Sequence, residues 1–568
     1  MSDIPIIEFE NFTFQYYSQA EPTLHDINLK IYPGQKILIV GPSGSGKSTL
    51  GNCLNGLIPF YYKGDSQGSL KVRGLQTREQ DIFTLSKIIG TVLQDSDGQF
   101  VGLTVGEDIA FAMENDNTPI KEMHERVLQV SKMVGMDSFL VSSPYELSGG
   151  QKQRTALAGV MIDDVDILLF DEPLANLDPA TDKTAIEIID DIHRQSGKTI
   201  IIIEHRLEDV LHCAVDRVIL INDGRILADM NPHEMVSSDM LIRNGIREPL
   251  YVTAMKYANI PVTPHLKPGH IWSLQIDEVR QPIRDWYHTA QPAARQSETF
   301  LLLELQNLDF SYDGLRLVLD AINFDIHEGE MVSIIGRNGA GKSTLAKLLC
   351  GFVKEDSGAV LYQGSNPHAK SIKERAQIIG YVMQNPNQMI SKNLIYDEVA
   401  LGLRLRHYPE AEIKPRVEKV LKICGLSPFI EWPISCLSYG QKKRVTIASI
   451  LVLEPRIIIL DEPTAGQDYR HYSEIMDFLV EINRLGVTII LITHDMHLML
   501  EYTPRAIVLS DGKKVADTSA SSVLTDLKVI EQANLKETSL YFLAQMAGLP
   551  DETSFVQRFI DYDRQVQR

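Results

Sequence analysis

The residues that decide the fold are Gly41-Pro42-Ser43-Gly44-Ser45-Gly46-Lys47-Ser48-Thr49 and, 295 positions later (342 minus 47), Gly336-Arg337-Asn338-Gly339-Ala340-Gly341-Lys342-Ser343-Thr344. Both stretches fit GxxxxGK[ST], in which glycines let the backbone approach phosphate, the lysine reaches the β- and γ-phosphates, and the hydroxyl binds Mg²⁺. Two ordered copies indicate two nucleotide sites rather than fortuitous glycine turns. We assign phosphate binding to Gly41, Ser43, Gly44, Gly46, Lys47, Ser48 and Thr49, and to Gly336, Asn338, Gly339, Gly341, Lys342, Ser343 and Thr344.

The rest of the chain repeats in the same order. Gln94 matches Gln384 and Ser148 matches Ser438, each 290 positions apart (384 minus 94, 438 minus 148). The match continues beyond these motifs, with 258–261 corresponding to 547–550. We therefore predict one domain at 1–262, a proline-bearing linker at 263–299 and a second domain at 300–568, each domain ending in its own extension.

Within each half, short apolar runs alternate with helical patterns. Residues 36–40, 167–170 and 199–203 are continuous apolar runs, as are their counterparts 457–460 and 488–492, which is typical of strands buried in a parallel sheet. A helix is expected at 48–57, and helical spacing at 120–134 and 411–424 predicts a separate helical subdomain. The predicted fold class is α/β, with two domains that each contain a mainly parallel sheet.

Composition excludes several classes of protein. The 568 residues are 44% apolar and 23% charged, which is typical of a globular protein rather than a disordered or membrane-embedded one. The net charge of -20 argues against general nucleic-acid binding. Apolar runs such as 199–203 are too short to span a bilayer, and residues 1–10 lack the basic start of a secretory signal, so we expect a cytosolic chain.

The cysteines are scattered and contain no CxxC pair, so neither zinc nor iron–sulfur ligation is expected. We expect them to be buried thiols. They are Cys53, Cys213, Cys350, Cys424 and Cys436.

Acidic pairs follow two of the predicted strands. Asp171 and Asp461 are candidates for holding Mg²⁺, and Glu172 and Glu462 for polarising the attacking water. Taken alone, such a pair is more often a strand end that meets solvent, and it gains weight here from its order and repetition. His205 and His494 each follow a further apolar run and could reach a γ-phosphate, although a lone histidine there is often structural.

A third motif lies between the phosphate loop and the acidic pair. It reads Leu147-Ser148-Gly149-Gly150-Gln151 in the first half and Leu437-Ser438-Tyr439-Gly440-Gln441 in the second, each ending 20 residues before the aspartate (171 minus 151, 461 minus 441). A serine and bare glycine amides at a helix N-terminus form an anion site. The motif resembles the signature of ABC-transporter ATPases, and the resemblance covers nearly all of both halves.

The resemblance implies ATP hydrolysis with ATP and Mg²⁺, and two nucleotide domains that pair head to tail within one chain. It makes Gln94 and Gln384 the Q-loop glutamines, 175–178 and 465–468 the D-loops, and Tyr16 and Tyr312 the residues that stack on adenine. The metal ligands implied are Ser48, Gln94 and Asp171, and Ser343, Gln384 and Asp461; the signature residues implied to bind the nucleotide of the other half are Ser148, Gly149, Gly150 and Gln151, and Ser438, Gly440 and Gln441.

The sequence departs from this family pattern in three places. Tyr439 replaces a signature glycine, Gln467 replaces a D-loop leucine, and Glu204-His205-Arg206 stands where the second half has Thr493-His494-Asp495. Since both glutamates of the acidic pairs are present, we expect two competent sites of unequal rate. Tyr439 adds bulk that would face the site built on Lys47, so that site is expected to be slower or differently shaped.

The family resemblance is closest to the tandem ATPases of energy-coupling-factor importers for vitamins, vitamin precursors, or cobalt and nickel ions. The segments that carry it are 94–100 and 384–389, together with the repeated extension. It implies a separate transmembrane scaffold and a substrate-capture membrane protein as partners, no nucleic acid, and a peripheral position on the cytoplasmic face of the membrane. A thiamine or hydroxymethylpyrimidine-like precursor is a weak preference.

Two alternatives stay open at this point: the ATPase of a sugar importer, and a soluble ABC protein acting on ribosomes or DNA. In the importer hypothesis, carboxylates near the first Q-loop could receive arginines from the membrane partner, or could simply form a solvated acidic surface. They are Asp95, Asp97, Glu107 and Asp108.

Overall fold

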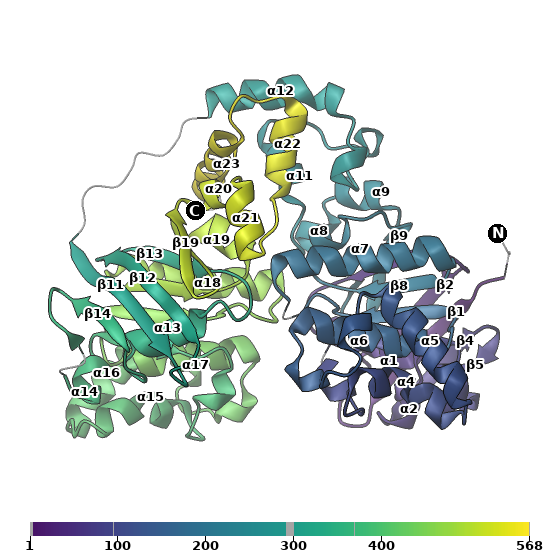
Figure 1. Ribbon diagram of the computed structural model, residues 1–568, viewed down its shortest axis with the longest axis horizontal. Coiled ribbons are helices and arrows are strands. Elements are labelled where there is room, and N and C mark those ends of the chain that lie inside the picture. Colours follow the sequence, from purple (N-terminus) through teal and green to yellow (C-terminus); the bar gives the residue numbers. More distant parts are fainter. Residues whose placement is uncertain (1–3, 95, 176, 291–299, 368–369, 567–568) are drawn as a thin grey trace. The chain divides into compact units, whose positions relative to one another are not determined.

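The computed structural model describes residues 4–94, 96–175, 177–290, 300–367 and 370–566. The chain forms two compact units, one built mainly from residues up to Trp286 and the other mainly from Tyr287 onward. Each unit is an α/β domain with a mainly parallel sheet, an antiparallel sheet and a group of helices, which confirms the predicted fold class (Figure 1).

The core sheet of the first half has the strand order β10-β9-β3-β8-β7-β6. Its strands are β3 (Lys36–Val40), β6 (Ile89–Val92), β7 (Ile167–Asp171), β8 (Thr199–Ile203), β9 (Arg217–Asn222) and β10 (Arg225–Met230). All neighbouring strands are parallel except β9 and β10. Strands β3 and β8 are buried along their full length, as the continuous apolar runs predicted.

The second half repeats this sheet in the order β15-β16-β17-β13-β18-β19. Its strands are β13 (Met331–Ile335), β15 (Ile379–Val382), β16 (Ile457–Asp461), β17 (Thr488–Ile492), β18 (Arg505–Ser510) and β19 (Lys513–Thr518). In both halves a phosphate-loop strand, β3 or β13, lies inside the sheet between two parallel neighbours. This position fixes the loop that follows the strand at the carboxyl edge of the sheet.

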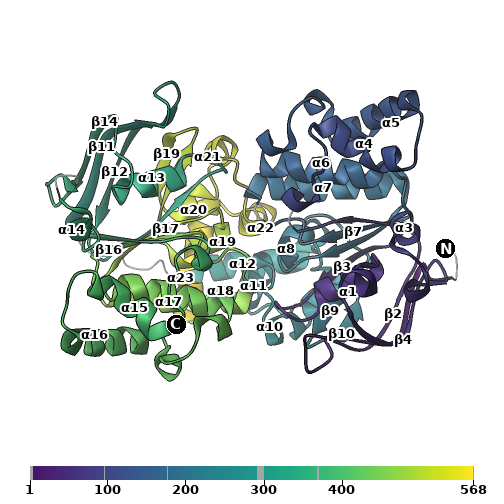
Figure 2. The ribbon, with the colours of Figure 1, turned by 90° about the horizontal axis from the view of Figure 1, so that it is seen from below.

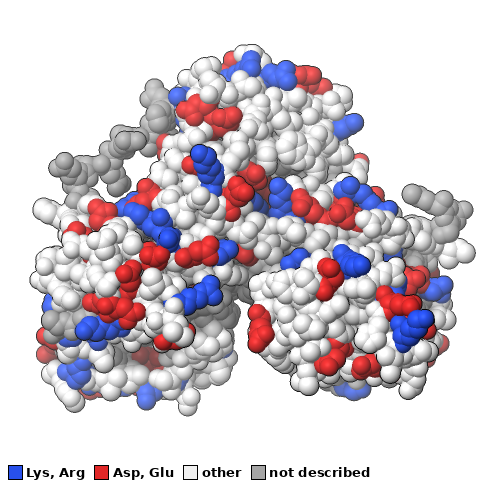
Figure 3. Space-filling model, in the orientation of Figure 1, with Lys and Arg blue, Asp and Glu red and all other residues white. Residues whose placement is uncertain are grey.

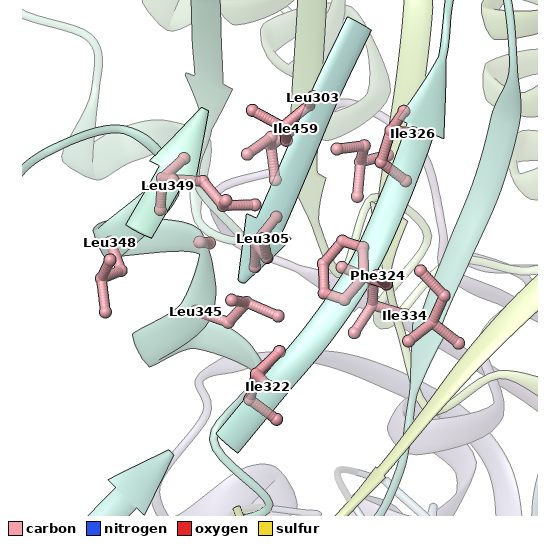
Figure 4. Packing of buried hydrophobic residues seen from close by; sticks show 14 of the residues in the cluster. Leu303, Leu305, Ile322, Phe324, Ile326, Ile334, Leu345, Leu348, Leu349 and Ile459 are labelled. Atoms are coloured by element: carbon pink, nitrogen blue, oxygen red, sulfur yellow. The ribbon is translucent and has the colours of Figure 1, made fainter. Parts of the chain in front are cut away.

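An antiparallel sheet completes the core of each half. In the first half it contains β1 (Ile7–Tyr16), β2 (Leu24–Ile31), β4 (Gly64–Val72) and β5 (Leu75–Gln76), and in the second β11 (Leu301–Ser311), β12 (Leu317–His327) and β14 (Ser357–Tyr362). Leu305 and Phe324 of the antiparallel sheet pack with Leu345 of the phosphate-loop helix and Ile459 of the parallel sheet (Figure 4). The phosphate-loop helix is therefore anchored in one apolar core with both sheets.

The phosphate-loop helices are α1 (Lys47–Leu54) and α13 (Lys342–Leu349). The predicted helix 48–57 was too long, because the chain turns at Gly56, which has a left-handed φ of 81°. The short helix α2 (Leu57–Phe60) follows that turn.

Each half contains a helical subdomain, as predicted, which is inserted in the chain between β6 and β7 or between β15 and β16. Its helices are α4 (Val105–Asn115), α5 (Ile120–Met133) and α6 (Gly149–Met161), and α15 (Ile395–Arg404), α16 (Glu410–Ile423) and α17 (Tyr439–Leu451). In the first half these helices gather at one end, away from β2 and β4 (Figure 2). The short helices α3 (Ile82–Ser86) and α14 (Ile372–Arg375) precede the edge strands β6 and β15.

The remaining helices cover the parallel sheets or form the extensions. They are α7 (Pro179–Ser196), α8 (Leu207–Val210), α9 (Pro232–Ser237), α10 (Met240–Arg243), α11 (Leu250–Tyr257) and α12 (Ile276–Thr289), and α18 (Tyr469–Arg484), α19 (Met496–Tyr502), α20 (Ala520–Val523), α21 (Leu527–Ala533), α22 (Ser539–Ala547) and α23 (Glu552–Val566). Helix α12 lies in the predicted linker, with Pro282 inside it, and the division between the two units falls within this helix. Residues 291–299 of that linker lie outside the described residues.

Three further observations concern hydropathy, surface charge and the cysteines. Among the described residues, no helix is long and apolar enough to cross a bilayer. Acidic and basic side chains are interspersed on the face shown in Figure 3. Cys53, Cys213 and Cys424 are buried as predicted and Cys350 is half-buried, but Cys436 is exposed because it ends a short surface turn (Ile434–Cys436) before the signature.

Candidate functional site

The two phosphate loops have nearly the same backbone. Gly46 and Gly341 both have φ of 98°, and Gly44 and Gly339 have φ of 77° and 80°. A Cβ on Gly41 would lie 2.1 Å from the carbonyl oxygen of Ile221, so no other residue fits there. Gly44 and Gly339 place no side chain over the loop, and a cradle for phosphate requires such close access to the backbone.

The phosphate-loop lysines fold back over their own loops. Lys47 Nζ donates to the carbonyl oxygens of Gly41 (2.8 Å) and Pro42 (2.9 Å). Lys342 Nζ makes the equivalent bonds to Gly336 (2.7 Å) and Arg337 (2.9 Å). Burial lowers the pKa of Lys47, while the carboxylates of Glu172 and Glu204 act in the opposite direction. A buried ammonium held by carbonyl groups is ready to bind an anion brought into the loop.

Hydroxyl and carboxylate oxygens meet beside each loop. Ser48 Oγ donates to Asp171 Oδ1 at 3.2 Å. Burial and the neighbouring charge of Glu172 raise the pKa of Asp171 to about 6. In the second half, Tyr381 Oη donates to Asp461 Oδ2 at 2.7 Å, and burial raises the pKa of Asp461. These hard oxygen donors fit Mg²⁺, which would supply positive charge to a bound phosphate chain.

The glutamates after these aspartates share an unusual backbone conformation. Glu172 has φ of 48° and Glu462 has φ of 44°, the left-handed region that side chains larger than glycine rarely adopt. Each is held there by its amide, which donates to the carbonyl of Ile203 (2.9 Å) or Ile492 (2.8 Å) in the neighbouring strand. Strained residues concentrate at functional sites, and here the strain fixes both carboxylates in the same way.

The side-chain partners of Glu172 come from two segments of the first half. Gln94 Nε2 donates to Glu172 Oε2 at 2.6 Å. His205 Nδ1 lies 3.9 Å from Glu172 Oε1 but 3.1 Å from Glu204 Oε1. Glu204 is buried and also accepts from the amides of His205 (3.0 Å) and Arg206 (3.3 Å). The histidine of the first half is thus held by a second carboxylate.

Arg206 anchors the same loop from its other side. Its guanidinium pairs with Asp182 at 2.8 Å and Asp209 at 3.6 Å, and it donates to the carbonyl of Leu174 at 2.5 Å. Burial by itself would lower the pKa of Arg206, but the carboxylates of Asp182, Asp209 and Glu204 outweigh it and raise the pKa.

The partners of Glu462 differ from those of Glu172. His494 Nδ1 lies 2.7 Å from Glu462 Oε1, and Thr493 Oγ1 donates to Glu462 Oε2 at 3.2 Å. Thr493 also accepts from the amide of Asp495 at 2.9 Å, and Asp495 caps α19 by accepting from the amides of His497 and Leu498. The histidine of the second half therefore engages the glutamate directly.

The signature residues begin helices α6 and α17. Ser148 and Gln151 form a capping box, in which Ser148 Oγ accepts from the Gln151 amide (3.3 Å) and Gln151 Oε1 accepts from the Ser148 amide (2.9 Å). Ser438 and Gln441 repeat it with the same distances. The serine hydroxyl keeps a proton to donate, at a helix end that favours anions. Gly149, Gly150 and Gly440 lie in the first turns of these helices.

The tyrosines expected at adenine lie beside the phosphate-loop helices. Tyr16 Oη is 3.1 Å from Thr49 Oγ1, and Tyr312 Oη is 3.3 Å from Thr344 Oγ1. The ring of Tyr16 packs edge-on against Phe14 and Tyr62, whereas Tyr312 is 59% exposed. Each tyrosine is thus placed next to its own loop.

Other predicted residues have different surroundings. Glu107 caps α4 by accepting from the amides of Leu103 and Thr104, and Asp108 accepts from the amides of Val101 and Gly102, so both carboxylates are engaged by their own loop. Asp95 lies outside the described residues, and so does residue 176 of the first D-loop.

The structure also contains residues that sequence reasoning missed. Tyr381 contacts Asp461, and Lys443 of α17 contacts the backbone of the second Q-loop. A position-by-position comparison of the halves would have drawn attention to Tyr381 and Lys443, because the equivalent residues in the first half are Thr91 and Gln153.

Comparison with known proteins identifies the domains. A family model described as "ABC transporter" matches residues 24–175 and 319–465, and one described as "ATP-binding cassette cobalt transporter" matches residues 238–310. A putative ABC transporter ATP-binding protein of Clostridium perfringens is 57% identical over 559 residues, covering 98% of each chain. One of Photobacterium profundum is 54% identical and covers 98% of this chain and 99% of its own.

One solved structure with a similar sequence covers less than half of this chain. The structure of cbiO1 from Clostridium perfringens, described as part of the ABC transporter complex cbiONQ, is 37% identical and covers 42% of this chain and 95% of its own, with a TM-score of 0.39. On the full-length similarity and the two matched domains, the chain belongs to the ABC transporter ATP-binding proteins, and it is an ATPase with two such domains in one polypeptide.

Proposed function

We propose that this protein hydrolyses ATP with Mg²⁺ to energise an importer of the energy-coupling-factor type. The coarser function, that of the ATP-binding subunit of an ABC transporter, follows from the family. The importer type is supported by the match of residues 238–310 to the cobalt-transporter family. These residues include the first extension and the linker, and the repeated extension is one of the features on which the resemblance to energy-coupling-factor ATPases depends. The cargo we propose is a vitamin, a vitamin precursor or a metal ion.

The observation that carries the proposal is the presence of a complete set of groups in each half: a phosphate loop, an acidic pair and a capped signature serine. Lys47 and Lys342 would bind the β- and γ-phosphates, and Glu172 and Glu462 would accept the proton of the attacking water. Ser48, Gln94 and Asp171, and Ser343, Gln384 and Asp461, would hold Mg²⁺. The ion would stabilise negative charge on the phosphates.

We propose further that the two halves pair head to tail. Ser438 and Gly440 would then complete the site built on Lys47, and Ser148 and Gly150 the site built on Lys342. A helix N-terminus with a serine proton to donate suits a γ-phosphate presented by another domain. Fusion in one chain raises the effective concentration of each half for the other.

The partner we propose is a separate transmembrane scaffold that docks beside the Q-loops. In the first half, Leu103 (81% exposed) and Val141 (87% exposed) lie on two loops that are joined where the Val105 amide donates to the Ser142 carbonyl. In the second half, Leu394 and Trp432 are exposed on the equivalent loops, which are joined where the Ile395 amide donates to the Trp432 carbonyl. Exposed apolar side chains that gather at one place favour a protein partner. Docking would place the chain at the cytoplasmic face of the membrane.

The test is to purify the tagged protein from gently solubilised membranes and to identify what accompanies it by mass spectrometry. A multi-span scaffold together with a small second membrane protein is expected, and the second protein would point to the cargo. A permease with a soluble binding protein would instead indicate a sugar importer, and ribosomal proteins would contradict the transport proposal. As a matched pair, Leu103→Glu should abolish recovery of the scaffold, while Glu125→Gln, on the exposed face of α5, should not.

A further inference from the structure

Helix α17 of the second half is bonded to the backbone of its own Q-loop. Lys443 Nζ donates to the carbonyl oxygens of Met383 and Gln384, both at 2.8 Å. One helical turn earlier, Tyr439 Oη donates to the same Gln384 carbonyl at 3.2 Å. Two consecutive carbonyls just after β15 are therefore held by one face of α17, the helix that Ser438 caps.

The lysine has little freedom to leave these carbonyls. Lys443 is 1% exposed. Burial lowers the pKa of Lys443 to about 8, although the carboxylates of Asp461 and Glu462 act to raise it. A buried ammonium needs polar partners, because losing them leaves a charge in a medium that solvates it poorly. Opening the Q-loop without moving the helix would strip the lysine of both carbonyls at once.

The first half is built differently at the same two positions. Gly149 stands where the second half has Tyr439, and Gln153 stands in place of Lys443, each 290 positions earlier (439 minus 149, 443 minus 153). Gln153 Nε2 donates to the carbonyl of Pro173, just after Glu172, rather than to the Q-loop. Its Q-loop is closed by Gln99, which accepts from the Leu93 amide at 3.0 Å and donates to the Thr91 carbonyl at 3.2 Å.

We propose that Lys443 and Tyr439 are positioning residues that make the second Q-loop and the second signature helix move as one body. In that half, a displacement of the segment around Gln384 is passed to Ser438 through three hydrogen bonds on two carbonyls. In the first half, the Q-loop and signature helix are coupled less tightly. The inference rests on the proposed function for the role it gives to Ser438, but the contact itself does not.

Hydrogen exchange of the nucleotide-free, full-length protein tests the contact. Lys443→Met keeps the length of the side chain but removes its hydrogen-bond donors. Exchange of the amides at 384–390 should become about 10-fold faster, because losing these bonds lowers the free energy needed to open the segment. Tyr439→Phe should speed it by about 3-fold. Lys442→Met, on the adjoining position of the same helix, is the matched control and should leave these amides unchanged. If Lys443→Met fails to fold, Tyr439→Phe decides the question.

Steady-state ATPase kinetics distinguish a positioning role of Lys443 from a general loss of structure in the variant. In Lys443→Met, kcat for ATP should fall by about 5-fold while KM changes by less than about 2-fold, because the phosphate loops are untouched. The inference would be overturned if folded Lys443→Met and Lys442→Met exchanged the amides at 384–390 at the same rate. This holds whatever the ATPase activity of the variants. If the wild-type protein has no ATPase activity, the proposed function fails, and the exchange experiment still decides the contact.

Discussion

Glu172 and Glu462 have the same strained backbone and different side-chain partners. Both have a left-handed φ and an amide bonded to the neighbouring strand. Glu172 is bonded by Gln94, while its histidine lies closer to Glu204; Glu462 is bonded by His494 and Thr493. The duplicated fold thus fixes the position of the glutamate, while the loops after β6, β8 and β17 supply the side chains that lie near it.

The difference shows that one backbone arrangement can carry different side-chain contacts in each half. The backbone that holds the glutamate depends on strands β7, β8, β16 and β17, which are buried and alike. The loops after β8 and β17 carry Glu-His-Arg in one half and Thr-His-Asp in the other. Unequal rates at the two sites are the expected consequence.

The largest effect is expected from replacing the glutamates with glutamine. Because an amide cannot accept the proton of water, the double variant Glu172→Gln/Glu462→Gln should lower ATPase activity by at least about 100-fold. Glu462→Gln alone should lower it by about 10-fold and Glu172→Gln by less than about 2-fold, since the site built on Lys47 is expected to be the slower one. Steady-state hydrolysis by the purified full-length protein measures all three.

The control is nucleotide binding, which should persist in each glutamine variant because the phosphate loops are intact. Equal losses from Glu172→Gln and Glu462→Gln would break the comparison between the halves. It would mean that the two sites depend on each other so strongly that their local differences do not reach the rate.

The fold could be predicted from the sequence because its signals are local. Apolar runs such as 36–40 and 199–203 and the glycine loop after 40 are enough to define strand, loop and helix. The linker could not be resolved in this way, because a proline-bearing segment gives no clear sign that 276–289 forms a helix. The end of α1 was also missed, since the turn at Gly56 depends on a positive φ.

The sequence predicts the residues of the candidate site but not the contacts among them. Motif order identified the lysines and acidic pairs, and the substitution at Glu204 was visible in the sequence. The left-handed backbone of Glu172 was not visible, because it depends on a bond to Ile203 in another strand. The burial of Lys443 was not visible either, because it depends on the packing of α17 against the Q-loop.

A second large effect should come from breaking the anchor of the first loop. Arg206→Ala leaves the side chain of Asp182, which is 2% exposed, without the guanidinium that pairs with it at 2.8 Å. Removing one partner of a buried ion pair typically destabilises by about 3 kcal/mol, so the unfolding midpoint in urea should fall clearly.

Arg243→Ala serves as the matched control, because its pair with Asp239 is exposed on both sides and should leave the midpoint unchanged. A normal midpoint for Arg206→Ala would contradict the view that the arginine anchors the loop. The position of Glu204 would then have to be explained without it.

A smaller effect is expected from giving the first half the residue of the second. In a Glu462→Gln background, Glu204→Thr removes the carboxylate 3.1 Å from His205 and supplies a hydroxyl like that of Thr493. The imidazole should then engage Glu172 as His494 engages Glu462. Residual ATPase activity should rise by about 3-fold, since repositioning one hydrogen bond at a reacting group is worth about a factor of this size.

The reverse exchange provides the check. Thr493→Glu in a Glu172→Gln background should lower the remaining activity, because a second carboxylate would compete for His494. A fall in activity after Glu204→Thr, in protein that melts normally, would show that the first half depends on its own arrangement rather than being slowed by it.

The smallest effect is expected from removing the hydroxyl groups of the two tyrosines. Tyr16→Phe and Tyr312→Phe remove only the hydroxyl contacts to Thr49 (3.1 Å) and Thr344 (3.3 Å), so affinity for ATP should change by no more than about 2-fold at either site. Tyr16→Ala and Tyr312→Ala also remove the ring and should weaken binding by about 10-fold, as expected for a lost stack on a base. Fluorescent nucleotide titration measures both pairs. Similar losses in the two halves would mean that the asymmetry arises at the glutamates. A much larger loss in one half would mean that part of the asymmetry arises where adenine binds, and the packing of Tyr16 against Tyr62 would then be part of its explanation.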